Sequence, residues 1–405
     1  MPDIRQLFPR DLRFYLVSRF CGATALTLLR STVSWHVYQL SHSPLQLGLI
    51  GLVQFAPALT LSLVGGAVAD TFERRRVSMT AQVVPFTAAT LLALSTAHGN
   101  ISVPVLYIAV FFVACAAAFD NPARASLLPT LVSRDLFPRA VTIASTIQAL
   151  AFASGPAIGG LIIARFGIAA AYATHVALIA ASMTNMSRLK PSRADTPRRA
   201  INMTVIREGL SFVRRQEVVL GCMTLDMFAV IFGGATALLP IYANDILHVG
   251  AQGFGQLSAA LETGALISAV AMLFLPTFRR SGRALLVAVG AFGIATIVFG
   301  LSRWFPLSIA AYMAAGMADQ VSVVMRSTMI QLSTPDELRG RVSSVNFIFI
   351  GASNQLGAME SGFVAAATNA TFSVVSGGLG CLIVLAIVAS RMPALRHYRI
   401  QSRAA

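Results

Sequence analysis

Four charged residues that could bind protons or a small anion or cation occur inside long apolar stretches of the sequence. They are Arg30, Asp226, Glu262 and Glu360. A charged side chain inside a membrane is energetically unfavourable, so such residues mark a substrate or ion path, or form structural ion pairs. A carboxylate that faces a water-filled cavity can bind a proton on one side of a membrane and release it on the other. We therefore favour proton coupling or substrate binding over structural ion pairing for these four residues.

Asp226 is the carboxylate that we expect to carry a proton. It lies about ten residues into its apolar stretch, roughly 15 Å along a helix and hence near the middle of a bilayer. We predict that Asp226 is neutral for part of the time or is paired with a cation such as Arg30. Glu262 and Glu360 are the alternative proton carriers.

The other ionisable residues in apolar stretches favour structural roles. Arg19, Asp120 and Arg326 lie near predicted helix ends, where an ion pair is the simpler interpretation. Isolated histidines are more often packed than proton relays, so we assign no function to His36 and His175. The four cysteines lie in apolar stretches and behave as small hydrophobic residues, so we predict no disulfide and no metal site.

The sequence lacks the common motifs of enzyme sites. A phosphate-binding loop needs Gly-Lys-Ser/Thr, whereas the one lysine, Lys190, follows Leu189. No histidine is followed by glutamate, and no Gly-x-Ser-x-Gly motif occurs. We predict that the protein is not an enzyme and carries no cofactor.

The composition is that of a membrane protein. Of the 405 residues, 56% are hydrophobic and 12% are charged, and the mean hydropathy is +0.72. Soluble domains carry about 25% charged residues, and disordered chains are far less apolar. The net charge of +15 does not indicate nucleic-acid binding, because the basic residues form short clusters between the apolar stretches.

The apolar stretches predict an all-α, polytopic membrane protein. A helix that crosses a bilayer needs about 20 mostly apolar residues, because lipid offers the backbone no hydrogen-bond partner. Twelve such segments occur, at 13–39, 45–69, 76–97, 101–122, 138–163, 167–187, 217–243, 252–277, 283–301, 305–329, 341–366 and 370–390.

The basic residues predict the orientation of these segments. Alternate loops contain nearly all the arginines, and the opposite set contains Arg165 and Arg303 as its only basic residues. Since arginine-rich loops stay on the cytoplasmic side, we expect both termini and the central loop in the cytoplasm.

The chain divides into two weakly repeated halves. The polar stretch 188–216 separates residues 1–187 from residues 217–405, and each half has six predicted spans. A shift of 202 residues aligns Arg124 with Arg326, and Gly160 with Gly362. Such a repeat is typical of transporters built from two parallel six-helix bundles.

The loop after the second span contains Gly66, Asp70, Arg74 and Arg75 in the order Gly-x-x-x-Asp-x-x-x-Arg-Arg. It resembles the signature loop of the major facilitator superfamily. We expect Gly66 to permit close helix approach, and Asp70 to cap a helix end or pair with a cation. The resemblance implies a conformational gate at the cytoplasmic face, with Arg124 as a plausible partner of Asp70. The alternative is an ordinary basic loop.

Two residues of this loop depart from the usual signature. Thr71 replaces a basic residue, and Glu73 replaces a glycine. A glutamate at that position is typical of the branch of enterobactin exporters and transmembrane secretion effectors. Segments 121–129, 225–234 and 331–341 resemble the same branch, so the resemblance covers nearly the whole chain.

The fifth span contains Gly155, Pro156, Gly159 and Gly160. This segment resembles the end of the motif that marks exporters in the superfamily, although the expected upstream glycines are absent. Proline breaks a helical hydrogen bond and glycines allow close packing, which suits a helix that bends during transport. The alternative is plain helix packing.

The resemblance implies a proton-coupled exporter of a small organic molecule, such as a siderophore-like metabolite or a drug, in the cytoplasmic membrane. Its expected partners are this substrate, protons and the lipid bilayer, and we expect a monomer. The alternatives are a multidrug or macrolide efflux pump, a nutrient importer or a membrane sensor that has lost transport.

Overall fold

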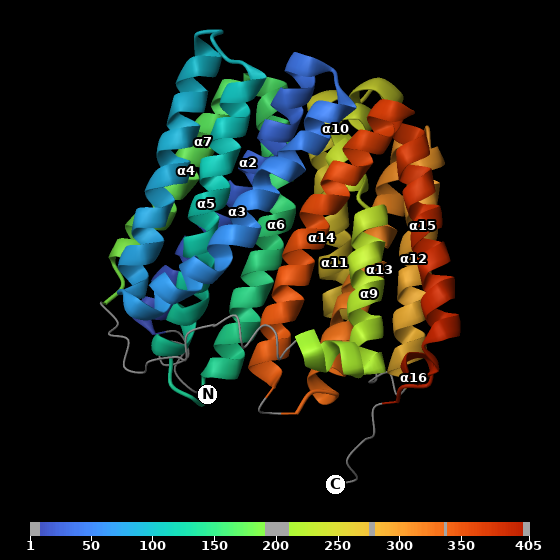
Figure 1. Ribbon diagram of the computed structural model, residues 1–405. Coiled ribbons are helices and arrows are strands. Elements are labelled where there is room, and N and C mark those ends of the chain that lie inside the picture. Colours follow the sequence, from blue (N-terminus) through green and yellow to red (C-terminus); the bar gives the residue numbers. More distant parts are fainter. Residues whose placement is uncertain (1–8, 191–209, 275–279, 336–337, 400–405) are drawn as a thin grey trace. The chain divides into compact units, whose positions relative to one another are not determined.

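The computed structural model describes residues 9–190, 210–274, 280–335 and 338–399. The described residues form helices and connecting turns, with no β-strand. This confirms the predicted all-α fold class, and a helical segment corresponds to each of the twelve predicted spans (Figure 1). Among the described residues, ten segments are long and apolar enough to cross a membrane, and α7 and α14 lie outside these ten.

The first six spans are continuous helices. Their bounds are α2 Arg10–Ser41, α3 Pro44–Thr71, α4 Arg74–Ala97, α5 Val103–Leu127, α6 Phe137–Phe166 and α7 Ile168–Ser187. A short 3₁₀ turn, η1 Leu128–Thr130, extends α5. Five of the last six spans are continuous as well: α11 Gly250–Phe274, α12 Ser281–Leu301, α13 Phe305–Leu332, α14 Arg339–Ala367 and α15 Ala370–Arg391, followed by the single turn α16 Pro393–Arg396.

The seventh span is discontinuous, which corrects the continuous segment predicted over 217–243. Helix α9, Glu217–Phe232, stops before Gly233 and Gly234, and η2 Ala235–Leu238, α10 Leu239–Ile241 and the π-turn η3 Tyr242–Ile246 follow. Two consecutive glycines weaken a helix, and Pro240 removes a helical hydrogen bond. The last turn is held by Tyr242, whose hydroxyl donates to the Gly300 carbonyl at 3.0 Å.

The chain forms two compact units. Unit 1 lies within residues 1–42, 56–201 and 250–259, and unit 2 lies within residues 43–55, 202–249 and 260–405. Helices α3 and α11 therefore each begin in one unit and end in the other. Most of the predicted central loop, 188–216, lies outside the described residues.

Unit 1 is organised around α2 and α4. Helix α2 packs on α6 and α7, and α4 packs on α5 and α7. A buried cluster joins Leu12, Tyr15 and Leu16 of α2 to Leu127 of α5 and Met186 of α7. These contacts fix the relative positions of α2, α5 and α7, which carry several of the polar residues of the candidate site.

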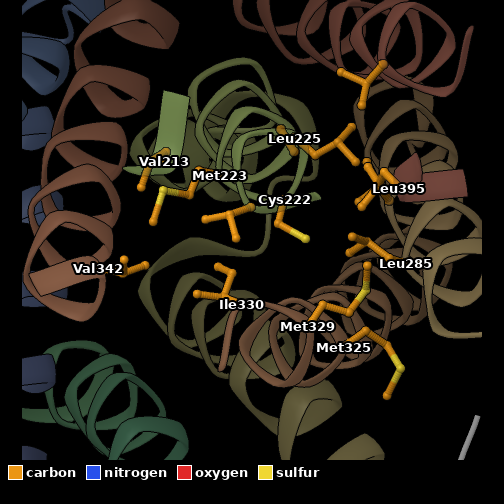
Figure 2. Packing of buried hydrophobic residues seen from close by; sticks show 14 of the residues in the cluster. Val213, Cys222, Met223, Leu225, Leu285, Met325, Met329, Ile330, Val342 and Leu395 are labelled. Carbon is orange, nitrogen blue, oxygen red and sulfur yellow. The ribbon is translucent and has the colours of Figure 1, made fainter. Parts of the chain in front are cut away.

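Unit 2 has a larger apolar core, part of which is drawn in Figure 2. Cys222, Met223 and Leu225 of α9 meet Met325 and Met329 of α13, and residues of α12, α14, α15 and α16 complete the cluster. The core packs α9 against α13, and these two helices carry Asp226 and Arg326.

Candidate functional site

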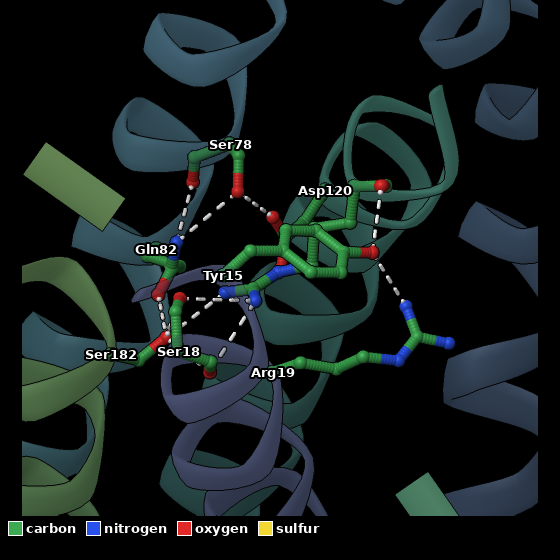
Figure 3. Close-up of polar contacts among 8 residues, drawn as sticks. Tyr15, Ser18, Arg19, Ser78, Gln82, Asp120 and Ser182 are labelled. Atoms are coloured by element: carbon green, nitrogen blue, oxygen red, sulfur yellow. Dashed lines mark hydrogen bonds and ion pairs between the residues drawn. The ribbon is translucent and has the colours of Figure 1, made fainter. Parts of the chain in front are cut away.

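A network of buried and partly buried polar side chains joins helices of unit 1. It consists of eight residues, which we call the Arg124 network (Figure 3): Tyr15, Ser18, Arg19, Ser78, Gln82, Asp120, Arg124 and Ser182.

Arg124 is the centre of this network. Its side chain comes from the last turn of α5 and the residue is 9% exposed. Nε donates to Asp120 Oδ2 at 2.8 Å, one turn earlier on the same helix. Nη2 donates to Ser182 Oγ of α7 at 3.0 Å, and Nη1 donates to the Ser18 carbonyl of α2 at 3.5 Å. One guanidinium therefore connects three helices.

Helix α4 closes the network. The Ser78 hydroxyl donates to the other carboxylate oxygen of Asp120. The Ser182 hydroxyl donates to Gln82 Oε1 at 2.8 Å, and Gln82 Nε2 donates to the Ser78 carbonyl at 3.1 Å. Each oxygen of the Asp120 carboxylate thus has a donor, as a charge in a low-dielectric site requires.

Two residues of α2 extend the network to α6. The Tyr15 hydroxyl donates to the main-chain carbonyl of Arg124 at 3.1 Å and accepts a hydrogen bond from Arg19 Nη1 at 2.9 Å. Arg19 Nη2 donates to Gln148 of α6. The contact of Asp120 agrees with the ion pair expected from the sequence, whereas Arg19 forms hydrogen bonds to Tyr15 and Gln148 in place of an ion pair.

The arginines of the signature loop contact the ends of two helices. Arg74 Nη1 donates to the Ser126 carbonyl at 3.1 Å, and Arg75 Nη1 donates to the Leu189 carbonyl at 2.7 Å. Carbonyl groups at helix C-termini carry partial negative charge, so both contacts are favourable. Glu73 accepts from Arg75 Nε at 3.1 Å, which holds the second arginine in place.

The side chain of Asp70 lies outside the part of the chain that the structure describes. Its predicted gate contact with Arg124 therefore stays a prediction. The described partners of Arg124 already include the Asp120 carboxylate.

The close helix approach predicted at Gly66 is wrong. A Cβ atom at Gly66 would meet nothing within 4 Å. The neighbouring Gly65 is buried instead, and a Cβ there would collide with the backbone carbonyl of Ala118 in α5. Adjacent residues of a helix point about 100° apart, so the motif placed the contact on the wrong face by one residue.

The glycines of α6 contact two different helices. A Cβ at Gly155 would lie 2.7 Å from the Thr24 carbonyl oxygen of α2. A Cβ at Gly160 would lie 2.6 Å from the Ala251 carbonyl oxygen of α11. A Cβ at Gly159 has more room, with the Ser31 hydroxyl at 3.3 Å as its nearest neighbour. Gly155 and Gly160 are thus the positions at which backbones touch.

In unit 2, Asp226 forms a buried ion pair with Arg326. The two side chains are 8% and 4% exposed, and they come from α9 and α13. The sequence offered Arg30 as an example of a partner for Asp226 and favoured a structural role for Arg326. The internal repeat marks Arg326 as the counterpart of Arg124, but it aligns Asp226 with Thr24 and so does not reveal the pair.

The structure pairs each of the two repeated arginines with a carboxylate, but with different connections. Arg124 takes its carboxylate from its own helix, whereas Arg326 takes Asp226 from a second helix. Protonation of Asp226 would therefore loosen an ion pair between two helices of unit 2, whereas protonation of Asp120 would weaken an ion pair within α5 and affect the hydrogen bond from Ser78 of α4.

The remaining predicted residues lie on other helices. Arg30 is exposed on α2, Glu262 is half-buried on α11, and Glu360 is half-buried on α14. The Ser361 hydroxyl donates to Glu360 Oε2 at 3.4 Å. Among the described residues, no group of three or more histidines, cysteines or carboxylates is close enough to hold a metal ion.

The sequence profile of transmembrane secretion effectors matches residues 14–404. The chain belongs to this family. Like its relatives, this secretion effector is a multi-pass membrane transporter, and its fold is the twelve-helix fold of the major facilitator superfamily.

Two curated relatives match this secretion effector over almost their whole length. The enterobactin exporter of Escherichia coli is 25% identical over 387 residues, which cover 96% of this chain and 93% of the exporter. The multidrug efflux pump Tap of Mycobacterium bovis is 31% identical over 389 residues, which cover 91% of this chain and 90% of the pump.

Solved structures support the fold of the secretion effector. A bacterial homologue of the human lysosomal transporter Spinster, in an inward-facing and unoccupied conformation, matches with a TM-score of 0.74 at 14% identity over 98% of this chain and all of the other. The nucleoside transporter NupG matches with a TM-score of 0.71 at 12% identity, over 96% of this chain and 100% of NupG.

Proposed function

We propose that the protein is a proton-coupled exporter of a small organic molecule across the cytoplasmic membrane. The observation that carries the export function is that relatives aligned over nine-tenths of the chain are named as exporters of different organic molecules. The buried Asp226–Arg326 ion pair supports the proton coupling, because a proton on the carboxylate would remove its charge.

The Asp226–Arg326 pair couples proton binding to helix movement in this proposal. While Asp226 is charged, it holds α13 to α9 through Arg326. A proton on the carboxylate removes this attraction and leaves a buried guanidinium without its counter-ion, which is strongly unfavourable. Protonation therefore favours a conformation in which Arg326 reaches water or an anionic partner, and loss of the proton restores the pair.

The proposed mechanism is alternating access by rocking of two six-helix bundles, residues 1–187 and 217–405, joined by the central loop 188–216. The Arg124 network supports a rigid N-terminal bundle, since hydrogen bonds among five of its helices resist internal rearrangement. The signature loop, with Asp70, Arg74 and Arg75, acts as the cytoplasmic gate. We propose that both termini face the cytoplasm and that the exporter is a monomer in the bilayer.

Two substrate classes follow from the relatives. A siderophore-like metabolite follows from the enterobactin exporter, and a drug follows from the efflux pump Tap, which has the higher sequence identity. We propose a siderophore-like metabolite or a drug as the substrate of this chain, and the two are distinguished by experiment.

Inside-out membrane vesicles that contain the protein test the proposal. Enterobactin and ethidium serve as the two probes, with an acidic lumen imposed by respiration. We expect one probe to accumulate in the lumen and the accumulation to collapse with an uncoupler. Accumulation that an uncoupler leaves unchanged would rule out proton coupling, and failure of both probes would rule out both substrate classes.

A further inference from the structure

A small cavity lies within unit 1, next to the Arg124 network. Its volume is about 50 Å³, and it lies between α2, α4, α5 and α7. Its walls include Gly22 of α2, Gln82 of α4, the Asp120–Arg124 pair of α5 and His175 of α7. One water molecule needs about 10–15 Å³ of accessible volume, so the cavity has room for a few.

The hydrogen bond of His175 fixes which of its ring nitrogens carries a proton. Nδ1 lies 2.8 Å from the Ala25 carbonyl oxygen of α2. A carbonyl oxygen accepts hydrogen bonds and cannot donate, so Nδ1 carries the hydrogen. In the neutral ring, Nε2 is then a bare acceptor with a lone pair.

Nε2 of His175 makes no hydrogen bond of normal geometry among the described residues, and the main chain of Pro85 in α4 is the second backbone group near the ring. The residue is 1% exposed, and Nε2 is buried. A packed structural histidine would be expected to satisfy both nitrogens, because a buried acceptor without a donor is unfavourable. His175 therefore satisfies Nδ1 with the Ala25 carbonyl and leaves Nε2 without a donor, while the Pro85 carbonyl can accept from a protonated ring.

We propose that His175 is a proton-binding residue of the transport cycle, which takes up its proton through water in the cavity that it shares with Asp120 and Arg124. This inference rests on the proposed proton coupling and adds a second proton-binding residue, in the N-terminal bundle. A hydronium ion that enters the cavity gives its proton to Nε2 and remains as water, and the ring becomes an imidazolium. Release is the reverse step, from Nε2 to water.

The groups that line the cavity control this step. Among its lining residues, Asp120 and Arg124 are the charged side chains, and α2 and α4 contribute none. The carboxylate attracts a positive ring and the guanidinium repels it, so their pairing leaves little net field. One turn before His175 on α7, the Tyr172 hydroxyl lies 3.0 Å from Nδ1 of the buried His36.

The conformation described here shields Nε2 from water. Nε2 is covered by protein atoms, and Gly22 leaves space for the guanidinium, because a Cβ there would lie 3.1 Å from Arg124 Nη2. A conformation of the cycle that connects this cavity to bulk water would expose Nε2 while the Arg124 network stays intact. Proton uptake is thereby limited to one part of the cycle, as antiport requires.

His175→Asn tests the proposal in vesicles, since the asparagine amide can keep the donor to Ala25 while Nε2 is removed. The probe is whichever of enterobactin and ethidium the wild type accumulates. We expect exchange without a gradient to stay close to wild type, and gradient-driven accumulation to fall about tenfold or more. His98→Asn is the matched control, because His98 makes the same Nδ1–carbonyl contact at 2.8 Å but is exposed.

The possible outcomes separate the two proposals. If accumulation by the wild type does not depend on the proton gradient, the proposed proton coupling is wrong, and so is the role of His175. If accumulation by the wild type depends on the proton gradient and the His175→Asn variant accumulates the probe equally well, only the proposed role of His175 is wrong. Equal loss of exchange and accumulation in the variant would assign His175 a structural role and overturn the proposal.

Nitrogen-15 NMR of the histidine-labelled wild type provides a measurement that needs neither transport nor a stable variant. The His175 signals are those lost in His175→Asn or in the more conservative His175→Gln. At about pH 8 we expect a neutral ring with the hydrogen on Nδ1. A ring with its hydrogen on Nε2 would overturn the proposal, because the proton-binding position would then be occupied.

Discussion

Neutralising Asp226 should destabilise the protein through Arg326. The Asp226→Asn substitution keeps the size of the side chain but leaves a guanidinium that is 4% exposed without its counter-ion. Breaking a buried ion pair by removing one partner costs about 3–5 kcal/mol. That is a large fraction of the roughly 5–15 kcal/mol by which proteins are stable, so we expect a clear loss of folded protein at moderate denaturant.

A double-mutant cycle separates this penalty from other effects of the substitution. Arg326→Gln alone leaves the Asp226 carboxylate unpaired, whereas the double variant has two neutral amides that can bond to each other. We expect the two single losses to exceed the loss of the double variant by about 2–3 kcal/mol, measured by unfolding in mixed detergent micelles. Glu217→Gln is the control on the same helix, because Glu217 is exposed and accepts a bond from the Ala394 amide.

Additive effects in this cycle would refute the reasoning. If both single variants lose less than about 0.5 kcal/mol, the pair is solvated and cannot act as a switch. Transport by the double variant, which we expect to be stable, identifies the role of Asp226. Exchange without gradient-driven accumulation makes it the proton carrier, while full accumulation passes that role to Glu262 or Glu360.

Three further tests address the helix contacts and the gate. Gly65→Leu should cost about 1–3 kcal/mol in the same unfolding assay, whereas Gly66→Leu should be nearly neutral; the reverse order would contradict the packing of α3 on α5. Gly160→Leu should reduce transport more than Gly159→Ala. The backbone of Ala251 leaves no room for a side chain at position 160, whereas a side chain at position 159 meets only the Ser31 hydroxyl and Leu28. Equal activities of the two variants in vesicles would argue against the contact at Gly160. Asp70→Asn should reduce export in cells at normal expression, and undiminished export would remove Asp70 from the gate.

The sequence determined the secondary structure and the family of this protein. A run of about 20 apolar residues has one stable form in a bilayer, the helix, so composition alone predicted the spans. The residues from Gly66 to Arg75 and the segment from Gly155 to Gly160 carried the resemblance to exporters that the relatives support. Gly233 and Gly234 are a local signal for the break after Phe232. The long apolar stretch around them nevertheless favoured a continuous span in the sequence prediction.

Tertiary structure decided which residues meet. In a soluble helix the apolar face marks the side that packs, but a membrane helix is apolar on all sides, so its sequence does not reveal which face touches a neighbour. The partner of Asp226 lies a hundred positions away in the chain, and the close contact of α3 lies at Gly65 and not one residue later at Gly66. The sequence could not show that Nε2 of His175 lacks a donor, because this follows from the position of the Ala25 carbonyl beside Nδ1.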